Sequence, residues 1–201
     1  MLYSRLPAFV LGFHGCDRNT ADRVVGTGKH LRLSRNDYDW LGHGVYFWEN
    51  DPLRARQWAK SKARRAKVAG RSFDPAIVGA VIDLGNCLNL LDATSNQLLA
   101  GGHKFLADAQ RSLRLPMPEN SNLKDDTDLL LRRLDCAVIN YLHDLIRTQG
   151  RPPFDSVRAA FIEGKPVYPG ATFRRKNHVQ ICVRSQASIR GYFHVLPHKI
   201  I

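Results

Sequence analysis

Short apolar runs occupy two separate parts of the chain, one at each end of a longer helical region. The runs are rich in β-branched and aromatic residues and are bounded by turn-forming residues, a pattern typical of strands. The pattern predicts strands in residues 9–15, 45–48, 76–84, 157–162, 178–184 and 191–196. We expect the run AIVGAVIDL in 76–84 to be a central strand, because it is apolar along nearly its whole length.

Helical periodicity dominates the rest of the chain. A helix is predicted in 20–28 and another in 54–67, where Pro52 follows Asp51 and suits a first helical turn. Further helical segments are predicted in 89–101, 104–115 and 126–147, with a boundary at 116–121, the segment PMPENS. Strands towards both ends with helices between them indicate an α+β fold rather than a regular βαβ succession.

Length and composition are those of an ordinary folded domain. The chain has 201 residues, of which 44% are hydrophobic and 9% aromatic, so it can bury a substantial core and is too apolar for a disordered chain. We therefore predict a single domain over residues 1–201, with a helical insertion at about 89–149.

The cellular location is inferred from three features. No apolar stretch approaches the ~20 residues needed to cross a bilayer, and the first residues contain no clear signal-peptide cleavage site. The four cysteines are far apart and form no CxxC pair: Cys16, Cys87, Cys136 and Cys182. This spacing predicts free buried thiols in a reducing compartment, so we expect a soluble cytoplasmic protein without a membrane partner.

The excess of positive charge indicates which classes of partner the protein can attract. The sequence carries 30 lysines and arginines against 18 acidic residues, a net charge of +12, which attracts polyanions and acidic proteins. Seven of the basic residues lie in 54–67, RARQWAKSKARRAK, which contains no acidic residue. This basic helix has two interpretations that remain open: a solvated helix face, or a surface for nucleic acid or an acidic partner.

Three short motifs follow one another on predicted strands: FHG at 13–15, GHGVYF at 42–47 and HVQICV at 178–183. Taken alone, each motif can also be explained without a binding site, as a glycine turn and a buried strand. Their order and contexts resemble the ADP-ribosyltransferase superfamily, in the H-Y-[E/D/Q] branch that includes poly(ADP-ribose) polymerases, tRNA 2'-phosphotransferases and many bacterial toxins. The resemblance covers roughly residues 9–67 and 155–196 and includes a second aromatic, Trp58, twelve positions after Tyr46.

The resemblance implies an α+β domain with a split mixed sheet, and NAD as co-substrate. It assigns His14 to the ribose hydroxyls, and Gly15 to the carboxamide through backbone groups that no side chain shields. Tyr46 and Trp58 would clamp the flat, cationic nicotinamide, a contact of ~0.5–2 kcal/mol. The structural alternatives are a core histidine, core aromatic residues and a plain turn.

Gln180 departs from the glutamate that many family members place in the third motif. Its amide can hydrogen-bond a ribose hydroxyl but supplies no negative charge. Polymer elongation is therefore not expected, whereas transfer of a single ADP-ribose remains possible. Glu163 and Glu49 are candidates for an assisting carboxylate, each with a surface or salt-bridge role as the alternative. His178 would share the strand face of Gln180, towards an acceptor or at a sheet edge.

These inferences predict an NAD-dependent mono-ADP-ribosyltransferase that acts as a toxin or defence effector. Its acceptor would be a macromolecule, with nucleic acid slightly ahead of protein because of the basic excess, and a neutralising antitoxin is a possible partner. Two alternatives belong to other classes: an inactive relative that binds NAD, ADP-ribose or a partner, and a basic nucleic-acid-binding module. Turnover of NAD separates the first reading from the other two.

Overall fold

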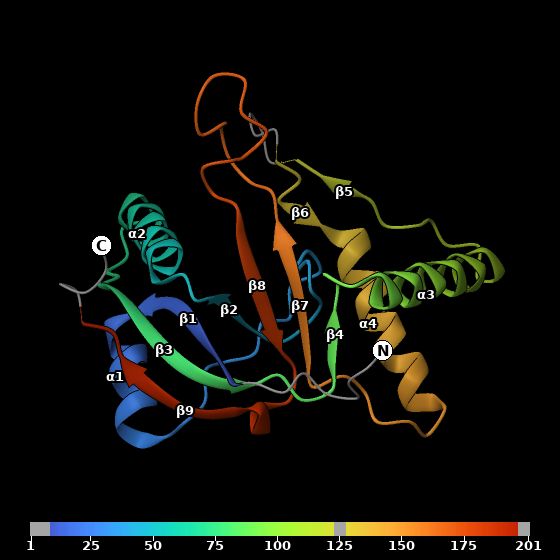
Figure 1. Cartoon of the computed structure of the whole chain (residues 1–201), viewed down its shortest axis with the longest axis horizontal. Helices are drawn as coiled ribbons and strands as arrows, with labels where there is room; N and C mark the ends of the chain where they lie inside the picture. The colour runs from blue at the N-terminus through green and yellow to red at the C-terminus, as the bar shows by residue number, and fades with distance from the viewer. Residues whose placement is uncertain (1–8, 123–127, 197–201) are drawn as a thin grey trace.

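The computed structural model describes residues 9–122 and 128–196, which form an α+β arrangement around a seven-stranded mixed sheet (Figure 1). The strand order is β4-β7-β8-β2-β1-β3-β9; β4 and β7 are parallel, and the other neighbours are antiparallel. The strands are β1 (Phe9–Asp17), β2 (Val45–Glu49), β3 (Pro75–Asp83), β4 (Cys87–Asn89), β7 (Ser156–Phe161), β8 (His178–Val183) and β9 (Ile189–His194). The predicted α+β class is confirmed.

The sheet has two well-paired parts with a short joint between them. On one side β1 pairs with β3 from Phe9 to Asp17. On the other side β2 pairs with β8, β8 with β7, and β7 with β4. The joint, between β1 and β2, has only the register pairs Gly12–Glu49 and Phe13–Trp48. Strand β3 lies between β1 and β9, as its continuous apolar run predicted.

Four helices pack around this sheet: α1 (Arg18–Thr27), α2 (Pro52–Val68), α3 (Ala93–Ser112) and α4 (Arg133–Thr148). The predicted start of the basic helix α2 is confirmed, because the Asp51 carboxylate accepts the backbone N–H of Arg54 at 2.9 Å and Pro52 opens the helix. Helix α2 lies at one end of the molecule, and α3 and α4 lie at the other (Figure 1).

The predicted helix boundaries in the middle of the chain are wrong in two places. Residues 89–101 and 104–115 belong mostly to one helix, α3, in which Gly102 packs against Leu142 of α4. Helix α4 begins at Arg133, after a small hairpin of β5 (Asn120–Ser121) and β6 (Leu131–Arg132). The Asn120 side chain accepts the N–H groups of Leu134 and Asp135 and so caps α4 from a distant segment. Residues 126 and 127 of the predicted helix lie outside the described residues.

The two larger buried clusters occupy opposite faces of the sheet. Neighbours Ile181 and Cys182 on β8 point into different clusters, as strand alternation requires. The first cluster contains Ala21 and Val24 of α1 together with Phe47. The second cluster contains residues of α4 and of the strands β4, β7 and β8: Leu88, Ile139, Leu142, Val157, Ala159 and Cys182.

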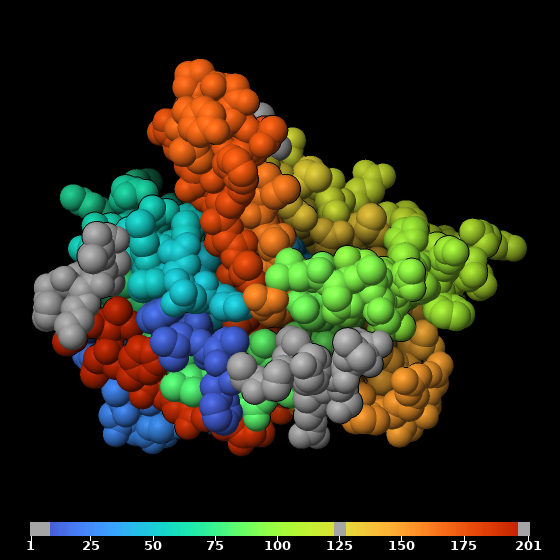
Figure 2. Space-filling view, in the orientation of Figure 1, coloured from blue at the N-terminus to red at the C-terminus, as the bar shows by residue number. Residues whose placement is uncertain are grey.

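The segment 162–177, which joins β7 to β8, projects beyond the rest of the molecule (Figures 1 and 2). Its side chains Ile162, Tyr168 and Phe173 are 71%, 59% and 66% exposed. A β-bridge between Pro166 and Arg174 links its two arms, together with backbone hydrogen bonds such as Val167 N–H to the Phe173 carbonyl at 3.0 Å. The segment therefore presents large apolar groups to solvent next to basic side chains.

All four cysteines are free thiols, as predicted. Cys16, Cys136 and Cys182 are buried and Cys87 is half-buried, and burial raises the pKa of the Cys182 thiol to about 12. Within the described ranges, no helix is both long enough and apolar enough to cross a bilayer.

We predict that His143, buried on α4, makes stability fall with acid. Burial and then the charge of Arg184 lower its pKa from 6.5 to about 4. The unfolded chain therefore binds more protons as pH falls below 6.5, and about 3 kcal/mol is lost by pH 4. Urea unfolding at several pH values should show a shallower loss for His143→Gln than for wild type. The matched control His103→Gln, at an exposed position on α3, should keep the wild-type slope; an unchanged slope in His143→Gln would contradict the assignment.

Candidate active site

His14 joins β1 to β2 where their ladder ends. Its Nδ1 lies 2.7 Å from the backbone oxygen of Tyr46, which can only accept, so Nδ1 carries the hydrogen. Burial is the main cause that lowers the pKa of His14, so the imidazole is neutral near pH 7. Its Nε2 is therefore a hydrogen-bond acceptor, and no partner for it is found among the described residues.

The Tyr46 hydroxyl is already occupied by structural hydrogen bonds. It donates to the carbonyl of Gly42 at 2.7 Å and accepts the N–H of Leu41 at 2.9 Å. Burial raises its pKa well above the ordinary value, so the phenol stays protonated. The hydroxyl fixes the preceding glycine turn, and only the half-buried ring is free to contact a ligand.

A row of aromatic rings runs from His14 across the sheet. Ring centroids are 6.3 Å apart for His14 and Trp58, 6.0 Å for Trp58 and Trp48, and 6.2 Å for Trp48 and His178. His178 then stacks on Phe161 at 5.3 Å. The row links residues of β1, α2, β2, β8 and β7, and we call it the ring row.

Hydrogen-bond acceptors and donors both lie in or beside the ring row. His178 donates from Nδ1 to the carbonyl of Lys176 at 2.6 Å, and burial lowers its pKa, so its Nε2 is also an acceptor. The indole N–H of Trp48 and the Nε–H of Arg54 are buried and have no hydrogen-bond partner within the described ranges. Such unpaired buried donors are rare and are satisfied by water or a ligand.

Gln180 lies beside the ring row, opposite Trp48 in the β2–β8 register. Its Oε1 accepts the indole N–H of Trp40 at 2.8 Å, which fixes the amide orientation because indole is only a donor. No partner for the amide nitrogen is found in the described part of the chain. Gln180 therefore presents N–H donors.

Neither candidate glutamate is a free base. The two Glu163 oxygens lie 3.0 Å from Arg54 and 3.0 Å from Lys176, and the Glu163 side chain is largely buried. Glu49 is held by the guanidinium of Arg158, with an Oε1 to Nη2 distance of 2.8 Å. Both residues occupy the salt-bridge role that the sequence left open.

Gly15 allows helix α2 to lie close against β1. A Cβ at this position would overlap the carbonyl oxygen of Ala55 and crowd the side chain of Ala59. The space beside Gly15 is therefore filled by backbone of α2. Contact of Gly15 with a carboxamide through its own backbone groups stays a prediction.

Sequence reasoning missed three residues of this arrangement: Trp40, Trp48 and Arg54. Trp48 lies two positions after Tyr46 on the same strand, so alternation could have placed both on one face. The roles of Trp40 and Arg54 depend on contacts with Gln180 and Glu163, which are distant in sequence.

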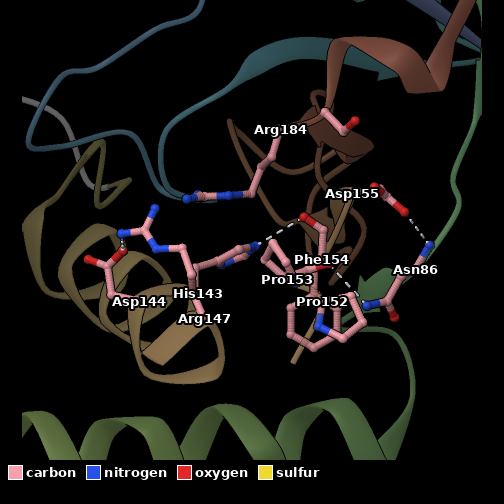
Figure 3. A pocket seen from close by; sticks show the side chains of 10 residues that line it. Asn86, His143, Asp144, Arg147, Pro152, Pro153, Phe154, Asp155 and Arg184 are labelled. Carbon is pink, nitrogen blue, oxygen red and sulfur yellow. Dashed lines mark hydrogen bonds and ion pairs between the residues drawn. The ribbon is translucent and has the colours of Figure 1, made fainter. Parts of the chain in front are cut away.

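Two cavities lie away from the ring row. One, of about 670 Å³, lies beside the C-terminal half of α4 and the end of β8 (Figure 3). The other, of about 350 Å³, lies at the end of the basic helix between Arg64, Lys67, Arg71 and Phe73. Neither is lined by His14, Tyr46, Trp58 or Gln180.

The sequence matches no protein-family model and no solved structure. It is similar to an uncharacterized protein, MJ0359, of Methanocaldococcus jannaschii. The two are 27% identical over 195 residues, which cover 89% of this chain and 83% of the archaeal protein. This similarity extends over most of both chains and assigns no activity.

We predict that Gly15→Ala destabilises the fold by about 1–3 kcal/mol, because the added methyl group meets backbone that cannot move without shifting α2. The matched control is Gly26→Ala on α1, where a Cβ meets nothing within 4 Å. This variant should be more stable than wild type by about 0.5–1 kcal/mol, because alanine favours the helix. Thermal and urea unfolding measure both. Equal stabilities of Gly15→Ala and wild type would show that α2 does not need this glycine.

Proposed function

We propose that this protein is an NAD-dependent mono-ADP-ribosyltransferase with an ADP-ribosyltransferase-like fold. The observation that carries the proposal is the junction of β1 and β2, where His14 donates to the Tyr46 backbone and begins the ring row that leads to Gln180. The three motifs of the sequence resemblance thus meet around one set of rings and unpaired polar groups.

The polar groups of the ring row fit the groups of NAD. The neutral His14 offers an Nε2 acceptor to a ribose hydroxyl hydrogen, and the Gln180 amide offers donors to a hydroxyl oxygen. The unpaired indole N–H of Trp48 could donate to a carbonyl or hydroxyl oxygen. Lys62 Nζ lies 4.7 Å from the centroid of the Trp58 ring, so a cationic nicotinamide has to displace Lys62 or use the opposite ring face to gain the same attraction.

In the proposed reaction the bond between the nicotinamide nitrogen and the ribose breaks, and its electron pair leaves with nicotinamide. The ribose carbon then bonds an acceptor nucleophile, which releases its proton to solvent water. Gln180 supplies no negative charge to the developing oxocarbenium, and Glu163 and Glu49 are neutralised by arginines. Positioning therefore has to supply much of the acceleration, and transfer stops at one ADP-ribose.

Two basic surfaces could hold a polyanionic acceptor. One is the exposed C-terminal half of α2, where Arg64 and Lys67 flank a cavity that also contains Phe73. The other is the projecting segment 162–177, with Arg174 and Arg175 near the exposed ring of Phe173. Basic side chains beside an aromatic ring suit single-stranded nucleic acid, which we propose as the acceptor. A toxin or defence role with a neutralising antitoxin is part of the same proposal.

A binding-only function is the second candidate, and one observation favours it. The Tyr46 hydroxyl and both glutamates are engaged in structural contacts, so neither candidate carboxylate is free to assist the reaction. Such a protein would bind NAD or ADP-ribose without releasing nicotinamide.

We predict that wild-type protein releases nicotinamide from NAD and transfers labelled ADP-ribose in a cell extract. His14→Ala and Gln180→Ala should each lower transfer about tenfold or more, because each removes hydrogen bonds at the reacting ribose. Gln180→Glu should keep NAD binding and raise nicotinamide release without acceptor, because a carboxylate stabilises the oxocarbenium. Separate nuclease and protease treatment of the labelled product identifies the acceptor class.

The control His103→Ala removes an exposed imidazole on α3 and should retain full transfer. Circular dichroism and NAD calorimetry check that the variants fold and bind. A folded His14→Ala protein with wild-type transfer would remove His14 from the site. Tight NAD binding by the wild type without nicotinamide release in any extract would establish the binding-only function instead.

We also predict that the double charge reversal Arg64→Glu, Arg65→Glu weakens use of an RNA acceptor. The slope of log acceptor use against log salt concentration should become shallower by roughly 1–2, because fewer counterions are released when the RNA binds. Nicotinamide release without acceptor should change little. Lys62 is left unchanged because it covers Trp58.

The matched control for this pair is Lys104→Glu, Arg111→Glu, which makes the same charge change on the exposed face of α3. If both double variants weaken acceptor use equally, only net charge matters. If neither does, the basic helix face is merely solvated, and the projecting segment becomes the surface to test.

A further inference from the structure

The cavity of about 670 Å³ beside α4 is lined by charged, polar and apolar side chains (Figure 3). Arg184 enters it from the end of β8, and His143 from α4. The opposite wall is the segment 152–154, a Pro-Pro-Phe sequence. Asp155 and Ser185 also line the cavity.

Arg184 differs from two other arginines that are largely buried. Arg54 is paired with Glu163, and Arg158 with Glu49. The guanidinium of Arg184 has no carboxylate within ion-pair distance in the described part of the chain. Its only hydrogen bond there runs from Nη1 to the amide oxygen of Asn140, at 2.9 Å. A partly desolvated cation with most of its N–H donors unused is an incomplete anion site.

Among the other charged groups of the cavity, one arginine is ion-paired and one carboxylate accepts a backbone N–H. Arg147 is paired with Asp144 at 2.8 Å, and both side chains are exposed. The Asp155 carboxylate accepts the backbone N–H of Asn86 at 2.9 Å. These contacts leave Arg184 as the cation that lacks a counter-charge.

His143 contributes shape rather than charge. Its Nδ1 lies 2.9 Å from the carbonyl of Ile139, and its ring packs edge-on against Phe154 at a centroid distance of 5.4 Å. The imidazole is neutral near pH 7 because burial lowers its pKa to about 4. The ring therefore holds Phe154 in the cavity wall and leaves the positive charge to Arg184.

We propose that this cavity binds a small organic anion, whose phosphate or carboxylate group pairs with Arg184 and whose apolar part packs on Pro152, Pro153 and Phe154. A guanidinium binds such planar or tetrahedral anions through paired N–H donors. A pocket with an apolar wall and a few fixed polar groups is the usual form of a small-molecule site. The proposal is independent of any NAD chemistry, since none of the ring-row residues lines the cavity.

The test uses phenyl phosphate, benzoate and inorganic phosphate as probes, at constant ionic strength. Calorimetry with wild-type protein should give tighter binding of phenyl phosphate than of inorganic phosphate, because only the former has an apolar part. Arg184→Gln should weaken phenyl phosphate binding about tenfold or more, and Arg184→Lys should retain an intermediate affinity because it keeps the charge without the paired donors.

Arg111→Gln makes the same charge change on the exposed surface of α3 and should bind as wild type does. His14→Ala should also bind normally, so failure of the proposed transferase activity does not affect this result. Equal affinities of folded Arg184→Gln and wild type would overturn the proposal.

A second measurement covers the case in which Arg184→Gln does not fold. In NMR titrations of wild type, phenyl phosphate should shift the signals of His143, Phe154 and Ser185 most strongly. Shifts concentrated in 54–67 would show non-specific attraction to the basic helix, and shifts around His14 and Trp58 would show binding at the ring row. Either outcome would overturn the assignment of the anion to this cavity.

Discussion

The hydrogen bond from His14 to the backbone of Tyr46 is the contact on which the arrangement of the candidate site depends. The two parts of the sheet meet only through β1 and β2, and their ladder has register pairs at two positions. Beyond Phe13 and Trp48 the imidazole takes the place of the next ladder bond. A side chain that spans two strands in this way has a fixed orientation and a fixed tautomer. Its second nitrogen is consequently an acceptor held at the start of the ring row.

The sequence was most informative where structure is decided locally. The strands followed from short β-branched runs, and the start of α2 from Asp51 and Pro52, which act within one helical turn. The start of α4 could not be found in this way, because its cap is the side chain of Asn120, outside the helix. The candidate site shows the same division. His14, Tyr46 and Gln180 were identified from motifs, whereas Trp40 and Arg54 acquire roles only through contacts formed in the folded chain.

The largely buried arginines Arg54 and Arg158 of this basic protein are each paired with a glutamate. The two glutamates nearest the motifs neutralise Arg54 and Arg158, each largely buried, where an unpaired charge would be costly. With the carboxylates used in this way, the polar groups of the ring row and of Gln180 are neutral: two imidazoles, an indole N–H and an amide. The Lys62 cation lies over Trp58. In the proposed reaction the neutral groups can orient a ribose and exclude water, but they add little charge stabilisation. The neutral Gln180 is therefore consistent with its surroundings.

The anion cavity and the candidate active site are proposed for different ligands, yet one set of contacts connects them. Gln180, Cys182 and Arg184 occupy alternate positions along β8 and its end, so their side chains leave the same face. Arg184 and the backbone N–H of His43 share the amide oxygen of Asn140, and the adjacent Gly42 carbonyl accepts the Tyr46 hydroxyl. An anion that draws Arg184 away from Asn140 would thus release one constraint on the turn that orients Tyr46.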